Sequence, residues 1–195
     1  MSRQLQVLIG VVAIVAPGLH LATDILEWAN GGFSSLQLWL NYAAFLPMPF
    51  LLVGLYAAQL PQIRSVGLLG ALLYGMAFVY FAHTTLYALR QGIPNYDALW
   101  AHLGPLYTVH GGLMVAGGLL FGAAALQASR VPRWAVLLFL FGIVLNLILA
   151  LVPAPEILQT VGSTFRNLGL MGIGLGLLRM EAQQGAAVDA ATRRG

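Results

Sequence analysis

The chain has 195 residues, of which 59% are hydrophobic and 8% are charged, and its formal net charge is +3. Soluble domains carry roughly 25% charged residues, so this composition excludes an ordinary soluble protein and indicates a lipid bilayer. The absence of cysteine excludes disulfides, thiolate nucleophiles and cysteine-ligated iron–sulfur clusters. The arginines are scattered and form no basic face, so nucleic acid is not an expected partner.

Six apolar stretches are long enough to cross a bilayer, which takes about 20 helical residues. Runs such as Trp134 to Leu151 are apolar on every face, unlike the alternating strands of a β-barrel. The sequence therefore predicts an all-α, polytopic integral membrane protein: one six-transmembrane-helix bundle over residues 1–180, then a flexible tail over 181–195. In chain order the predicted spans are 5–27, 37–60, 66–89, 104–127, 134–153 and 156–179.

Proline and glycine mark several of these spans. Pro17 falls in the first span, and Pro47 and Pro49 fall in the second, where each proline removes a backbone hydrogen bond and tends to kink the helix. Glycines are dense in the fourth and sixth spans, and small residues let helices pack closely. The alternative is a flat cofactor lying against Gly111 and Gly112. Between the third and fourth spans, residues 91–103 form the longest outer loop, and one interpretation is a short amphipathic lid over the polar layer. The alternative is that Tyr96 and Trp100 only anchor the loop at the membrane interface.

The orientation follows from the arginines at the ends of the spans. All but one of them fall on one side of the six-span bundle, and Arg90 alone falls on the other. By the positive-inside rule both termini are then cytoplasmic, in a cell membrane and most simply a bacterial inner membrane. The arginines on the cytoplasmic side are Arg3, Arg64, Arg130, Arg133, Arg179, Arg193 and Arg194.

Three histidines fall at nearly the same depth in three different spans. Counting about 1.5 Å per residue from the outer helix ends, His20, His83 and His110 each lie roughly 10 Å below the outer boundary. Three imidazoles resemble a catalytic zinc set that leaves one position open for water, and two of them would suffice to ligate a haem b. The alternative is that each histidine only hydrogen-bonds a neighbouring helix.

Two carboxylates share a helix face with the first of these histidines. Asp24 and Glu27 follow His20 at i+4 and i+7, so either of them is a candidate catalytic base for a metal-bound water. The alternative is that both are solvated at the membrane surface and do not interact with His20.

Arg166 is the charged residue predicted deepest in the membrane. An arginine so far from the interface normally faces the bundle interior, and its guanidinium fork suits a carboxylate or a phosphate. Further polar residues complete a candidate ligand-binding set. Its members are Arg166, Asn167, Asn41, Asn146 and Tyr107.

Three functional hypotheses remain open, and only the first is enzymatic. One is a zinc or haem site acting on a lipid-soluble small molecule such as a quinone, an isoprenoid or a lipid. Another is a non-catalytic protein that binds or transports a small hydrophobic or anionic solute. The last is an accessory subunit whose glycine-rich faces pack against partner membrane subunits or a second copy of the chain.

Overall fold

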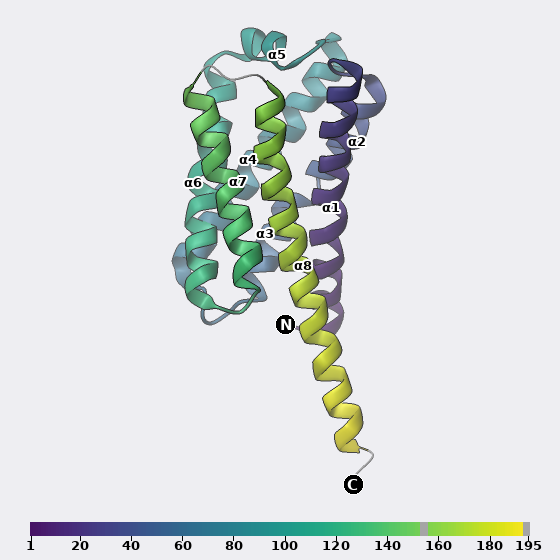
Figure 1. Ribbon diagram of the computed structural model, residues 1–195, viewed down its shortest axis with the longest axis vertical. Coiled ribbons are helices and arrows are strands. Elements are labelled where there is room, and N and C mark those ends of the chain that lie inside the picture. Colours follow the sequence, from purple (N-terminus) through teal and green to yellow (C-terminus); the bar gives the residue numbers. More distant parts are fainter. Residues whose placement is uncertain (153–155, 193–195) are drawn as a thin grey trace.

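The computed structural model describes residues 1–152 and 156–192, with side chains through residue 152 and from 158 to 183. These residues are all-helical, as the sequence predicts. Seven helices run along one long axis, and α5 lies across one end of the bundle (Figure 1). The helices are α1 Arg3–Asn30, α2 Ser35–Phe45, α3 Met48–Ala57, α4 Arg64–Gln91, α5 Tyr96–Leu103, α6 Pro105–Ala128, α7 Arg133–Leu151 and α8 Glu156–Thr192.

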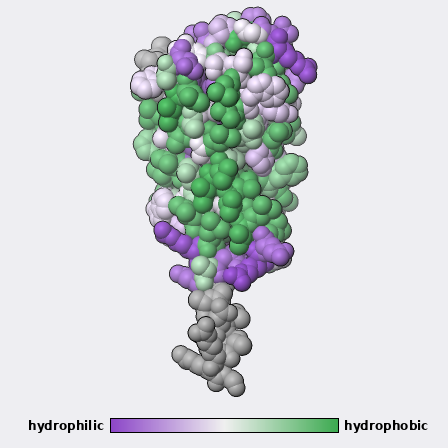
Figure 2. All heavy atoms as spheres, turned by 90° about the vertical axis from the view of Figure 1, so that its right-hand side faces the viewer, coloured by the Kyte–Doolittle hydropathy of each residue, from purple (hydrophilic) through white to green (hydrophobic). Residues whose placement is uncertain are grey.

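Five stretches of the described residues are long and apolar enough to cross a membrane. They are α1, the segment Ser35–Ala57 that contains α2 and α3, α4, α6 and α7. The sequence predicts six spans, and the predicted sixth, in α8, is not among the five. In a space-filling view, hydrophobic residues cover the middle of the bundle and hydrophilic residues gather towards its two ends (Figure 2). This distribution is the one expected of a protein that crosses a bilayer.

The second predicted span is divided into two helices. Ser34 caps the start of α2, because its hydroxyl accepts a hydrogen bond from the Gln37 N–H at 3.2 Å. The helix ends at Phe45, and α3 begins directly after Pro47, which has no N–H to donate to the hydrogen-bond ladder. The predicted kink is thus a complete break between two helices. Pro17, by contrast, lies inside the uninterrupted α1.

The last helix is longer than the sequence predicts. We expect the sixth span to end at residue 179 and a flexible tail to begin at 181, whereas α8 continues to Thr192. Residues 193–195 lie outside the described residues, and the flexibility of the tail stays a prediction. The two chain ends lie towards the same end of the bundle (Figure 1), which we call the terminal end, and α5 covers the opposite end.

Three helix pairs make the most extensive contacts: α4 with α6, α7 with α8, and α1 with α8. The first and the last helices of the chain are therefore neighbours. An ion pair of 3.1 Å between Arg3 Nε and Glu181 Oε2 joins these two helices near the terminal end.

Glycine lets two of these pairs approach closely. A Cβ atom at Gly117 of α6 would overlap the backbone of Tyr74 in α4, and one at Gly142 of α7 would overlap the backbone of Arg166 in α8. Gly111 and Gly112 behave differently, because a Cβ at either position would meet no atom within 4 Å. Close packing therefore explains the glycines near the middle of the bundle, and it does not explain Gly111 and Gly112.

The predicted lid is the short helix α5. Asn95 caps it, with its side-chain oxygen accepting a hydrogen bond from the Ala98 N–H at 2.9 Å. Leu99 and Ile93 pack against Leu38 of α2 and Ala88 of α4, so the segment is fixed to the bundle by its own apolar cluster. The lid thereby covers one end of the interior that the following sections describe.

We expect Gly117→Ala and Gly111→Ala to have different effects although both lie in α6. The Gly117 variant must push α4 away from α6, which lowers the free energy of unfolding by about 1–3 kcal/mol. The Gly111 variant meets open space and gains helix propensity, so its stability stays equal or rises by up to about 1 kcal/mol. Denaturant unfolding in detergent measures both. Equal losses in the two variants would contradict the proposed difference in packing.

Candidate functional site

A chain of polar contacts crosses the interior between α8 and α1. The Asn167 side-chain nitrogen lies 3.4 Å from His20 Nδ1, and His20 Nε2 lies 3.4 Å from Asp24 Oδ1. An amide nitrogen only donates, so Nδ1 accepts and the ring proton of neutral His20 sits on Nε2, directed at the carboxylate. All three residues are buried. The contacts run in one direction, from the Asn167 amide through His20 to Asp24.

A second set of contacts connects this chain to α2. The Thr23 hydroxyl donates to the His20 backbone carbonyl at 2.7 Å and lies 3.2 Å from the side-chain oxygen of Asn41. Thr23 and Asn41 are both buried. The helix face that carries His20 is therefore held in place by neighbours on two other helices.

Arg166 is buried beside this chain, with 4% of its surface exposed. Its Nη1 contacts the sulfur of Met114 in α6 at 2.9 Å, and its Nη2 donates to the Ser163 hydroxyl at 3.4 Å. Its Nε has no partner among the described residues. The close polar contact of the Asp24 carboxylate is with His20 and not with this guanidinium. Since a thioether is a weak acceptor, the guanidinium is poorly satisfied for its depth of burial.

Asn146 belongs to a separate pair. Its side-chain nitrogen donates to both the backbone carbonyl and the side-chain oxygen of Gln159, each at 2.9 Å, and so connects α7 to α8. Its own oxygen has no partner among the described residues. Asn146 therefore has an observed structural contact, and a part in ligand binding stays a prediction.

The lid extends this polar region towards the surface. Burial raises the pKa of the Tyr96 phenol well above its ordinary value, and the charge of Glu27 acts in the same direction. The Tyr96 phenol therefore stays protonated at neutral pH and remains a hydrogen-bond donor near the Glu27 and Asp24 carboxylates. The centroid of its ring lies 4.8 Å from that of Phe33 and 6.4 Å from that of Tyr107. Tyr96 and Tyr107 thereby connect α5 to the first turn of α6.

His110 is fully buried in an aromatic environment. The ring centroids of Phe81 and Tyr107 each lie 4.6 Å from its own. Neither ring nitrogen of His110 has a hydrogen-bond partner among the described residues. The prediction that it hydrogen-bonds a neighbouring helix is therefore not met, and its contacts are with aromatic rings.

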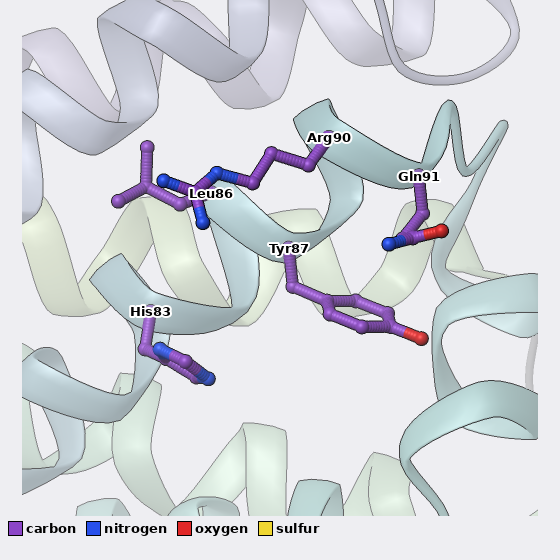
Figure 3. Close-up of a pocket in the computed structure, with 5 residues that line it drawn as sticks. All are labelled: His83, Leu86, Tyr87, Arg90 and Gln91. Carbon is purple, nitrogen blue, oxygen red and sulfur yellow. The ribbon is translucent and has the colours of Figure 1, made fainter.

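His83 lies on the outer surface of α4. It is exposed and lines a shallow hollow together with Tyr87 and Arg90 (Figure 3). His20 and His110, by contrast, are buried, each in the different surroundings described above. The part of the chain that the structure describes contains no group of three or more histidine, aspartate or glutamate residues able to hold a metal ion. The three histidines therefore have different surroundings, and the common depth predicted for them stays a prediction.

The two carboxylates proposed as bases have different surroundings. Asp24 is buried and contacts His20, as the i, i+4 spacing suggests, while its second oxygen has no partner among the described residues. Glu27 is half-buried near Tyr96. Neither arrangement tests a catalytic role, which stays a prediction.

Sequence reasoning missed three residues that the structure brings to the site. Thr23 was detectable, because it lies three residues after His20 and is polar within an apolar span. Met114 and Gln159 gave no comparable signal: methionine is ordinary in a membrane helix, and the partner of Asn146 depends on how α7 and α8 are rotated about their axes.

Comparisons with protein-family models, with curated proteins and with solved structures find no match to this chain. Its function is therefore argued from its own residues.

Replacing each buried histidine by phenylalanine separates their roles. His20→Phe leaves the Asn167 amide and the Asp24 carboxylate without their partner, so we expect the free energy of unfolding to fall by about 2–5 kcal/mol. His110→Phe removes two unpartnered nitrogens from an aromatic environment and is expected to be neutral or stabilising. Thermal or denaturant unfolding in detergent distinguishes them. A large loss in His110→Phe would show that this imidazole has a polar partner.

Proposed function

We propose that this is a multi-pass membrane protein that binds the anionic group of a small, lipid-soluble molecule at Arg166. The observation that carries the proposal is a guanidinium buried in the bundle whose polar contacts are a methionine sulfur and one hydroxyl at 3.4 Å. A buried charge normally has an opposite charge or a full set of hydrogen bonds, because removing it from water costs several kcal/mol. A carboxylate or a phosphate would complete the contacts that Arg166 lacks.

The surrounding groups suit such a ligand. The Arg166 fork provides parallel donors for a carboxylate or a phosphate, and the Ser163 hydroxyl lies on the same side of α8. Asp24 interacts electrostatically with Arg166, yet its close polar contact is with His20. This carboxylate therefore leaves the hydrogen-bond donors of the guanidinium available to a ligand. Arg166 lies among apolar helices, which favours an amphipathic molecule over a free inorganic ion.

Among the hypotheses from the sequence, this proposal develops the solute-binding one. A zinc or haem site has less support, because His83 is exposed and the described residues contain no metal-binding group of three or more histidine or acidic residues. The buried pair of His20 and Asp24 would then contribute to the shape and polarity of the binding site.

The test compares ligands that share an eight-carbon chain and differ only in the headgroup. Isothermal titration calorimetry of the detergent-purified protein should detect binding of octanoate or octyl phosphate, and much weaker binding of octanol. Arg166→Gln removes the charged fork and should weaken binding by about tenfold or more. Arg179→Gln is the matched control, because Arg179 is an exposed arginine of the same helix. Equal binding of octanol, or unchanged binding by Arg166→Gln, would refute the proposal.

The stability of the ligand-free protein gives a second measurement. If Arg166 serves an external ligand, Arg166→Met should leave the free energy of unfolding equal or raise it by about 1–4 kcal/mol, because an unpaired buried charge is removed. A loss of about 3–5 kcal/mol would instead mean that the guanidinium has an internal partner and a structural role.

We infer further that α8 supplies a sixth span and that both chain ends are cytoplasmic in a cell membrane. The two ends lie at the same end of the bundle, and α8 packs along both α1 and α7. Arg90 lies at the α5 end, whereas four arginines next to helix ends, and Arg179 within α8, lie towards the terminal end, which the positive-inside rule assigns to the cytoplasm. These are Arg3, Arg64, Arg130, Arg133 and Arg179.

The orientation can be tested with single cysteines, because the natural chain has none. Asp97→Cys in α5 and Gln127→Cys near the end of α6 both replace exposed side chains, at opposite ends of the bundle. A membrane-impermeant maleimide added to intact cells should label the Asp97 variant and leave the Gln127 variant unlabelled until the membrane is opened. The reverse pattern would invert the orientation, and labelling of both would mean that the two ends do not lie on opposite sides.

A further inference from the structure

A hollow of about 340 Å³ lies on the outer face of α4, close to the end of the bundle that carries α5. Pockets for small ligands span roughly 300–1,000 Å³, so its size suits a headgroup. Figure 3 shows that the residues lining it all belong to the C-terminal part of this helix. They are His83, Leu86, Tyr87, Arg90 and Gln91.

The polar side chains of the hollow are free to bind a ligand. His83, Tyr87, Arg90 and Gln91 each carry a hydrogen-bond donor, and Arg90 adds a permanent positive charge. None of the four has a hydrogen bond or an ion pair from its side chain to any of the described residues. The lining contains no carboxylate. Such a set, with one positive charge and no carboxylate, favours a negatively charged group with several acceptor oxygens over a cationic one.

An apolar stripe leads from the hollow towards the middle of the bundle. Leu72, Met76 and Val79 precede His83 at helical spacing, and each of the three is about half exposed. They lie on a helix that is long and apolar enough to cross a membrane. A molecule with an anionic head in the hollow would therefore have room for acyl chains along this stripe.

We propose that the hollow binds the phosphate headgroup of an anionic phospholipid, with the acyl chains lying along Leu72, Met76 and Val79. Arginine is suited to this role because its planar fork donates two parallel hydrogen bonds to a phosphate. Arg90 lies in the last turn of α4, at the end of a helix that is long and apolar enough to cross a membrane. Lipid phosphates lie at that level of a bilayer. The site is separate from Arg166 and does not depend on the function proposed for it.

The test measures lipid retention by the full-length protein. Native mass spectrometry of protein in detergent should show saturable binding of one phosphatidylglycerol, and weaker binding of phosphatidylcholine with the same acyl chains. Arg90→Gln should weaken phosphatidylglycerol binding by about tenfold, while Arg90→Lys, which keeps the charge, should lose less. Arg133→Gln removes an exposed arginine from the opposite end and should change nothing. These side chains are exposed, so all three variants should unfold at the wild-type temperature.

A second variant tests the acyl-chain track. Met76→Asn introduces a polar group halfway along the stripe and should weaken binding of phosphatidylglycerol. Inorganic phosphate at millimolar concentration should fail to displace the lipid. Displacement by phosphate would show that the hollow recognises the free ion. Unchanged lipid binding by Arg90→Gln, or equal losses in Arg90→Gln and Arg133→Gln, would overturn the proposal.

Discussion

A charged side chain inside an apolar bundle must have polar partners, and Arg166 imposes this requirement on the helices around it. Gly142 lets the backbone of α7 pack directly against the backbone of Arg166, so the position of α8 is fixed at this level. The guanidinium then extends to Met114 of α6, and the next residue, Asn167, points to His20 of α1. The position of one helix thereby determines both the charged and the neutral part of the site.

The interior near α5 consequently differs from the rest of the bundle. Towards the middle, glycines such as Gly117 bring the helix backbones together, and aromatic side chains such as Phe78 and Phe139 fill the core. Around Arg166, several buried polar atoms of the described residues have no partner. Such atoms are rare in packed interiors, because each costs about 1–3 kcal/mol. Three of these atoms, Asp24 Oδ2, Arg166 Nε and Asn167 Oδ1, belong to the connected residues described above, which is the physical reason for assigning ligand binding to that group.

Sequence reasoning identified the helices because length and hydropathy suffice for that, whereas the depth of the polar layer, which was obtained by counting residues, stays a prediction. It did not predict how each helix is rotated about its own axis, and so which side chains face the interior. In a soluble helix the apolar stripe shows which face is inside, but α4 is apolar on the lipid side as well, so nothing in the pattern showed that His83 faces outward. His20 was better defined, because Asp24 shares its face. The partner Asn167 is 147 positions away and depends on tertiary packing alone.

The contact between the first and the last helices also affects how the protein is made. During synthesis α1 is made long before α8. His20 and Asp24 therefore lack their contact to Asn167 until the last helix has been synthesised. The adjacent pairs α4 with α6 and α7 with α8 can form as soon as each is translated, since their partners are near in sequence. The polar interior is therefore completed last. A chain cut before α8 would leave a histidine and an aspartate facing lipid, a state that membrane quality control could recognise as unfinished.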